Sequence, residues 1–396
     1  MSALSHPGFC AYFIAAVPLT QALWAQRVTL GWLAWDMSGS AAYVGLIAAL
    51  GLVPVLVSGP VFGVLVDRAD IRRAIMTTSA AMLALLVLAA VLAGSGALGQ
   101  GGLAFLALSV GVVSSAHHPV RMSLGPRLVP RADVSGVVAL SALNFNMARL
   151  IAPALTGTAL ASVGAVATLW ASAALYLPML FAVRWMDPRP LPPGAGSDPI
   201  MVGVRAAGRY ILTTPVARQA VILTAAMAIP VRGYLELLPV MAEGVHDRGA
   251  EGLGLLTAAA GGGALLAALA KASARKAGVT RLLRCVLIAG VCALLPLGLA
   301  TGWWAALAWT AVLGFASTFC GVTLQAAVQQ DLPDDLRGRV MSLWVVVGIG
   351  SVALGSGAMG GLAGLFGLPL TLVGAGCLGG AVTIVLTLRS AQNAAT

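Results

Sequence analysis

The stretch Gly63–Ile75 reads GVLVDRADIRRAI and joins two long apolar runs of the chain. Gly63 has no side chain to hold a neighbouring helix away. Asp67 follows four residues later, where a membrane helix would end and a carboxylate could face the positive N-terminus of another helix. The basic residues that follow, which favour the cytoplasmic side of a membrane, are Arg68, Arg72 and Arg73. The stretch therefore predicts a short cytoplasmic turn between two membrane helices.

The composition of the whole chain agrees with a membrane protein. Of its 396 residues, 59% are hydrophobic and 9% are charged, and the mean hydropathy is +0.96. Soluble domains have about 45 to 50% apolar and about 25% charged residues. Apolar runs of about 20 residues, long enough to cross a bilayer, recur from one end to the other. The first run is longer than the apolar region of a signal peptide and has no basic residues before it, so we expect it to remain as a membrane helix.

Twelve apolar runs are long enough to span a bilayer as helices, because a helix satisfies its own backbone hydrogen bonds in lipid. The predicted spans are 9–36, 41–66, 74–95, 102–127, 134–160, 163–184, 217–243, 251–271, 282–301, 304–330, 340–365 and 368–389. The fold class predicted from them is an all-α integral membrane protein.

The basic residues predict the orientation of these spans. Cytoplasmic loops are enriched in lysine and arginine, and most of the 23 basic residues face one side when both termini are cytoplasmic. The net charge of +10 then faces anionic lipid headgroups. No basic stripe interleaved with aromatic residues indicates a nucleic-acid partner. We expect a multi-pass protein of the inner, or cytoplasmic, membrane.

A linker divides the chain into two parts of six spans each. The segment 185–216 opens with DPRPLPPGAGSDP, whose prolines and glycines end the helical pattern. Its later part, 200–212, is amphipathic and either lies along the membrane surface or begins the seventh span. The halves, 1–184 and 217–396, show a weak internal repeat at an offset of 203 residues. Two such halves are typical of secondary transporters, whose sites lie where the halves meet.

The Gly63–Ile75 stretch resembles the signature of the major facilitator superfamily, with Asp70 in place of the usual second glycine. The runs 126–157 and 324–344, together with YLELLPVMAEGV at 234–245, resemble its branch of drug and siderophore exporters. The fifth span departs from the glycine-rich motif of proton-coupled exporters, since Ala152–Pro153 replaces Gly-Pro. The resemblance implies an alternating-access transporter in which spans one and seven line a central cavity. By the resemblance, the cytoplasmic gate motif comprises Gly63, Asp67, Arg68, Arg72 and Arg73. Arg121 is assigned to the same gate from its position near the cytoplasmic end of span four.

Charged residues inside the spans are the main candidates for a functional site, because a charge at membrane depth costs at least about 2.5 to 3.5 kcal/mol. Glu236 is the acid that lies well inside a span, and it stands four residues from Arg232, on the same helical face. We expect the two to pair, either as a static salt bridge or as a proton-coupling switch. Pro230 and Pro239 allow bending around them.

The predicted substrate cavity contains these two residues and polar residues of spans one and five. By the resemblance, Arg27 and Arg232 face each other across the cavity. Arg149 shares a helical face with Asn146 and either lines the cavity or glues helices together. Arg121 either supports the gate motif or snorkels to the cytoplasmic surface. The complete set predicted for the cavity is Gln21, Gln26, Arg27, Asn146, Arg149, Arg232 and Glu236.

These residues predict a secondary transporter, most simply a proton-coupled exporter of a small amphipathic or anionic molecule such as a drug, siderophore or metabolite. The alternatives are uptake or facilitated diffusion of an organic anion or lysophospholipid, and a scaffold without transport. Enzyme motifs are absent from the sequence, and the scattered cysteines and adjacent His117 and His118 predict neither a disulfide framework nor a metal site. We expect no cofactor, and a monomer whose partners are the substrate, protons and the bilayer.

Overall fold

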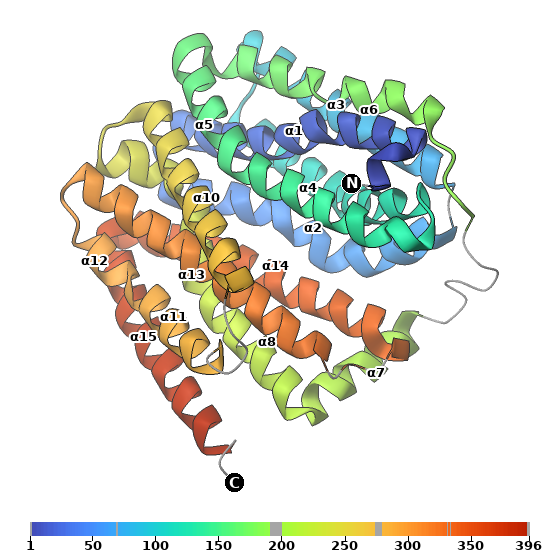
Figure 1. Cartoon of the computed structure of the whole chain (residues 1–396). Coiled ribbons are helices and arrows are strands. Elements are labelled where there is room, and N and C mark those ends of the chain that lie inside the picture. The colour runs from blue at the N-terminus through green and yellow to red at the C-terminus, as the bar shows by residue number, and fades with distance from the viewer. Residues whose placement is uncertain are drawn as a thin grey trace.

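A computed structural model describes residues 2–68, 70–190, 200–273, 279–330, 332 and 334–393, and every regular element among them is a helix (Figure 1). The first part of the chain forms η1 (Ser2–Ser5), α1 (Pro7–Ser38), α2 (Ala41–Arg68), α3 (Ile71–Gly94), α4 (Gln100–Arg127), η2 (Arg131–Asp133), α5 (Val134–Ala174), α6 (Leu177–Ala182) and η3 (Val183–Trp185). The second part forms α7 (Ile200–Thr213), α8 (Pro215–Met227), η4 (Ala228–Arg232), α9 (Gly233–Leu235), η5 (Val240–Val245), α10 (Gly249–Ser273), α11 (Val279–Cys292), α12 (Leu294–Gly298), α13 (Trp303–Gln330), α14 (Asp334–Phe366) and α15 (Leu368–Asn393).

Each predicted span coincides with helix, but the count of twelve stays a prediction. Within the described residues, eight helices are long and apolar enough to cross a membrane, or nine if the bent pair of 205–213 and 215–235 counts as one span. Two further apolar helices, Ala41–Leu56 and Leu282–Gly298, are shorter. One of the eight, Arg131–Trp185, covers two predicted spans. It is divided at Gly164, whose φ of 79° is a left-handed conformation that glycine adopts without strain.

Short-range chemistry fixes the turn that follows α2. The Asp70 carboxylate accepts hydrogen bonds from the backbone N–H groups of Arg72 and Arg73, at 2.9 and 3.4 Å, and so caps the N-terminus of α3. This is the aspartate that stands where the superfamily signature usually has its second glycine. Arg72 also donates from Nη2 to the carbonyl oxygen of Val183, at 3.1 Å. The turn is thereby joined to the end of η3.

Part of the predicted gate motif lies where the structure describes only the backbone. Gly63, Asp67 and Arg68 fall in 57–69, whose side chains lie outside the described residues. The motif residues with described side chains are Arg72, Arg73 and Arg121. Arg73 lies near the carboxylate of Asp70, at 3.7 Å, with most of its side chain exposed.

The segment predicted as the seventh span is interrupted twice. Prolines lack a backbone N–H, and their rings clash with the preceding helical turn. Pro230 lies within the π-helical turn η4, and Pro239 directly precedes the π-helical turn η5. Between them α9 has only three residues, and Glu236 follows it as the C-cap. π-helical turns often occur at functional sites. These two turns interrupt the regular α-helical hydrogen bonding of this segment.

Helix α7 is a separate element rather than the straight beginning of the seventh span. The chain bends by 96° between 205–213 and 215–235. Helix α7 packs against α14 and reaches α2 (Figure 1). Arg205 and Arg209 are exposed, and Ala207 between them is buried.

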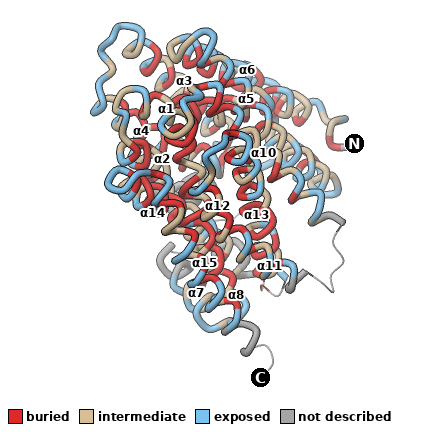
Figure 2. Tube along the Cα trace, turned by 90° about the vertical axis from the view of Figure 1, so that its left-hand side faces the viewer, coloured by how far each residue is buried: buried red, intermediate tan, exposed pale blue. Residues whose placement is uncertain are grey.

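The first and second parts of the chain meet along two pairs of long helices, α2 with α14 and α5 with α10. In Figure 1 the helices coloured blue to green gather above those coloured orange to red, and α10 crosses between them. Buried residues lie toward the middle of the bundle, and exposed residues follow the outer faces of the helices (Figure 2). Many exposed residues are large and apolar, among them Phe105 and Leu354, as expected for a surface that faces lipid.

Glycines allow the backbones of these helix pairs to touch. A methyl group added at Gly360 in α14 would lie 2.8 Å from both the Ala41 carbonyl oxygen and the Gly45 Cα in α2. One added at Gly157 in α5 would lie 2.5 Å from the Gly254 Cα in α10. Side chains do not fit at such distances, so small residues set the separation of the helices.

Replacing Gly360 by valine should therefore destabilise the protein. The added side chain cannot be accommodated unless α2 and α14 move apart, and overpacking of this kind costs about 1 to 3 kcal/mol. The melting temperature in detergent, measured by scanning fluorimetry, should fall by several degrees. Gly361→Val is the matched control, because a methyl group at Gly361 meets no atom within 4 Å. Equal melting temperatures for the two variants would contradict the close contact.

Candidate functional site

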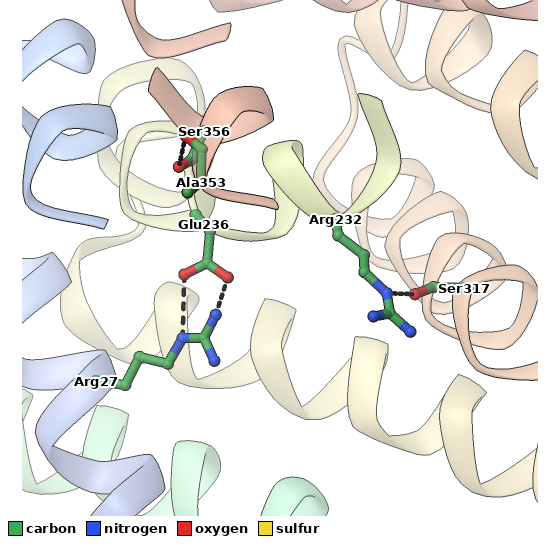
Figure 3. A network of polar contacts seen from close by, with 6 residues as sticks. All are labelled: Arg27, Arg232, Glu236, Ser317, Ala353 and Ser356. Carbon is green, nitrogen blue, oxygen red and sulfur yellow. Dashed lines mark hydrogen bonds and ion pairs between the residues drawn. The ribbon is translucent and has the colours of Figure 1, made fainter. Parts of the chain in front are cut away.

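An ion pair joins α1 to the interrupted segment that follows α8. Arg27 donates from Nε to Oε2 of Glu236, at 3.1 Å, and from Nη2 to Oε1 of the same carboxylate (Figure 3). Both carboxylate oxygens are thus bound by one guanidinium, which is the strongest geometry for such a pair. The Glu236 side chain is 12% exposed and that of Arg27 is 43% exposed, so the carboxylate is the more desolvated partner.

The expected pairing of Glu236 with Arg232 is corrected by this arrangement. Figure 3 shows the two side chains pointing in different directions, and Arg232 donates from Nε to the hydroxyl of Ser317 in α13, at 2.9 Å. The prediction assumed a regular helix, in which residues four apart share a face. The backbone is helical from Arg232 to Glu236, but the two side chains reach different helices. Arg232 binds α13 and Glu236 binds α1.

Arg149 makes a second contact between the two parts of the chain. It lies in α5, and its Nη1 donates to the hydroxyl of Thr318 in α13, at 3.1 Å. Thr318 directly follows Ser317, the partner of Arg232. The charge of Arg149 interacts with the charges of Arg27, Arg232 and Glu236. Three arginines and one glutamate therefore form a single electrostatic cluster, which we call the central cluster: Arg27, Arg149, Arg232 and Glu236.

The other residues predicted for the cavity have different surroundings. Gln26 is 4% exposed, and its amide oxygen accepts a hydrogen bond from the hydroxyl of Tyr176, at 3.1 Å. Asn146 donates to the backbone carbonyl of Ala142, one turn earlier in α5. The amide oxygen of Gln21 is buried with no hydrogen-bond partner among the described residues. The structure therefore does not join these three amides to the central cluster by hydrogen bonds.

Arg121 belongs to a polar group within the first part of the chain. Its Nη1 donates to the hydroxyl of Thr20, at 3.2 Å, and Asn144 donates to the same hydroxyl, at 3.1 Å. The Tyr12 hydroxyl donates to the backbone carbonyl of Arg121, at 3.1 Å. Helices α1, α4 and α5 are thus held together by one group of hydrogen bonds. This arrangement differs from the snorkelling considered for Arg121, because the guanidinium is bound inside the bundle.

Aromatic rings adjoin Arg27. The Trp24 ring lies 5.7 Å from the guanidinium carbon of Arg27, within the range of a cation–π interaction. The Phe145 ring in α5 lies 5.7 Å from the Trp24 ring. The central cluster therefore has an apolar, aromatic border on the α1 side.

Ser317 and Thr318 are site residues that the sequence prediction missed. They lie in the middle of α13, which is otherwise mostly apolar. A neighbouring pair of hydroxyls inside a predicted span was the available signal, but serine and threonine also satisfy their hydroxyls on their own helix. Among the described residues, no group of three or more His, Cys, Asp or Glu side chains could hold a metal ion.

Comparison with known proteins places the chain in a family. The chain matches the family described as transmembrane secretion effector over residues 1–395. It is similar to the enterobactin exporter of Salmonella typhi, with 27% identity over 372 residues, which covers 90% of this chain and 86% of that protein. It is also similar to the staphyloferrin A transporter of Staphylococcus aureus, with 25% identity over 42% of each chain.

Solved structures of membrane transporters share the fold. A bacterial homologue of the human lysosomal transporter Spinster, in an inward-facing and occupied conformation, matches with a TM-score of 0.74 and 12% identity, over 98% of this chain and 97% of that one. The nucleoside transporter NupG matches with a TM-score of 0.72 and 10% identity, over 96% and 98% of the two chains. The protein is thus a multi-pass membrane transporter of small molecules rather than an enzyme, and it belongs to the transmembrane secretion effector family of the major facilitator superfamily.

Proposed function

We propose that the protein is a proton-coupled exporter that moves a small amphipathic, anionic molecule out of the cell by alternating access. Its cargo is of the siderophore, drug or metabolite class. In this proposal the halves 1–184 and 217–396, joined by the linker 185–216, move against each other in the inner membrane. Both termini lie in the cytoplasm, and the protein acts as a monomer.

The observation that carries the proposal is the Arg27–Glu236 ion pair. It joins α1, in the first proposed half, to the interrupted segment in the second. A carboxylate that leaves its guanidinium partner inside a protein is disfavoured in its charged form, so it binds a proton. Proton binding to Glu236 and separation of the two halves are then coupled events.

The relatives and the charge of the site support the direction of transport and the sign of the cargo. The family is described by secretion, and the relative from Salmonella typhi is named as an exporter of enterobactin. The central cluster holds three arginines against one glutamate, which favours a negatively charged cargo. The aromatic rings of Trp24 and Phe145 offer apolar surface to the rest of such a molecule.

The closest backbone contacts between the halves support a state that is closed on the outside. Gly45 and Gly360 touch near the start of α2 and the end of α14, and Gly254 lies near the start of α10. The Trp35 ring at the end of α1 lies against Gly244, where an added methyl group would be 2.6 Å from the ring. All these positions lie at the ends that the proposed orientation places outside.

A flux assay with Glu236→Gln tests the coupling. Purified protein in liposomes should transport enterobactin faster when a pH gradient is imposed, because the movement of protons down the gradient drives the cargo. Glutamine keeps the size of the side chain but cannot release a proton, so the variant should lose at least about nine-tenths of the gradient-driven flux. A trapped pH-sensitive dye should also report no cargo-dependent proton movement.

The control variant for this assay is Glu251→Gln, which removes an exposed carboxylate in the first turn of α10 and should leave the flux unchanged. An equal response to the pH gradient in wild type and Glu236→Gln would refute proton coupling at this residue. Flux that the gradient does not change in wild type would instead favour facilitated diffusion. Inward accumulation of the cargo would favour uptake.

An exchange of the two charges tests the contact between the halves. Arg27→Glu and Glu236→Arg each break the ion pair, and we expect either change to cost at least about 1 to 3 kcal/mol. That range lies below the cost for a fully buried pair, because the Arg27 side chain is 43% exposed. The double variant Arg27→Glu/Glu236→Arg should recover part of the lost melting temperature in detergent. Strictly additive losses in the double variant would show that the pair does not contribute to holding the halves together.

A further inference from the structure

We propose that Arg149 and Arg232, together with the hydroxyls of Ser317 and Thr318, form a receptor for a ligand that carries two negative charges. This assignment rests on the proposed function, because it names the class of cargo that the central cluster takes. A single negative charge would leave one of the two arginines without a counter-charge. The two charges can lie on separate acidic groups or on one phosphate-like group.

The central cluster has more positive than negative charges. Glu236 is the acid of the cluster, and both of its oxygens are bound to Arg27. Arg149 and Arg232 bind uncharged hydroxyls instead. Neither of them forms an ion pair among the described residues. The cluster thus has a surplus of two positive charges, one on each of these arginines.

The two arginines bind neighbouring hydroxyls and keep further N–H donors for a ligand. Ser317 and Thr318 are consecutive residues of α13, so Arg149 and Arg232 are bound to the same turn of this helix. A guanidinium has five N–H donors in a planar fork that matches a carboxylate or phosphate, and each of these two uses one donor on its hydroxyl. Both carry donors that a ligand can use. The charges of the two arginines repel each other, which a ligand with two charges would relieve.

A glycine and a small cavity lie beside the guanidinium of Arg232. A methyl group at Gly321, four residues after Ser317, would lie 2.9 Å from Nη2 of Arg232. A cavity of about 10 Å³ adjoins Arg232, Ser317 and Thr224, and the Thr224 hydroxyl is buried with no partner among the described residues. Such a volume suits about one water molecule. A water there can bind part of the guanidinium, and Arg149 is not among the residues that line this cavity.

The position of the two arginines gives the site a function in transport. Arg149 comes from α5 and Arg232 from η4, which lie on opposite sides of the proposed linker. A ligand with one charge for each arginine therefore bridges the two halves, whereas a ligand with a single charge is held by only one. Closure of the halves around the cargo is then stronger for a dianion.

Binding of four aromatic probes to the purified full-length protein tests the assignment. Benzamide is neutral, benzoate carries one charge, isophthalate carries two charges on separate groups, and phenyl phosphate carries two on one group. Calorimetry should show isophthalate binding at least about ten-fold more tightly than benzoate, because each arginine gains a counter-charge. Arg149→Gln and Arg232→Gln should each reduce this preference to less than about three-fold. Phenyl phosphate then shows whether the two charges must be on separate groups.

The control variants separate loss of charge from loss of structure. Arg248→Gln removes a guanidinium that lies over Trp303 and away from the cluster, and it should keep the preference. Arg149→Lys and Arg232→Lys keep the charge and should keep most of the preference for isophthalate. Equal affinities of benzoate and isophthalate for wild type would overturn the assignment, as would absence of isophthalate binding up to about 10 mM. A preference that survives in both glutamine variants would overturn it as well.

This experiment is independent of the test of proton coupling. The preference for a dianion is measured at equilibrium without a membrane or a pH gradient. If it holds and Glu236→Gln transports normally, the proposed coupling is wrong and the receptor stands. If transport depends on Glu236 and the preference is absent, the receptor is wrong and the proposed function stands.

Discussion

The low polarity of a membrane interior is the constraint on which the rest of this structure depends. A charge there is costly unless another charge or several hydrogen bonds compensate it. Glu236 meets this requirement through Arg27, which holds both carboxylate oxygens. Among the described residues, Arg149 and Arg232 meet it only partly, through one hydroxyl each. The difference between these two solutions divides the central cluster into a neutral pair and a positively charged remainder.

The same constraint explains how much of the fold could be predicted from the sequence. Backbone groups in lipid must be satisfied within a helix, so long apolar runs read directly as helices, and the structure has helix in each of them. The number of spans was harder to establish, because Gly164 separates two runs within a single long apolar stretch. Length and composition alone also pass over shorter helices such as Leu282–Gly298.

The site was less predictable from the sequence than the fold. The sequence identified the charged residues of the central cluster, because charges are rare in apolar runs. It assigned the wrong partner to Glu236, since spacing along one helix cannot show that Arg27 of another helix lies within hydrogen-bond distance. Ser317 and Thr318 escaped notice because hydroxyls in a membrane helix are common and usually bind their own backbone. The role of Asp70 as the cap of α3 shows how a departure from the superfamily signature is compatible with a stable turn.

The glycines that line the contacts between α2 and α14, and between α5 and α10, have a consequence for motion. Interlocked side chains would have to change rotamers before two helices could slide or tilt, which would raise a barrier between positions. Backbones that touch at Gly45, Gly157, Gly254 and Gly360 have no interlocked side chains at these four positions. In the proposed alternating-access cycle, such contacts would let the helices of the two halves change their crossing angle with few rotamer changes at these positions. Polar contacts between the proposed halves, such as that of Arg27 with Glu236, would then help to favour one angle over another.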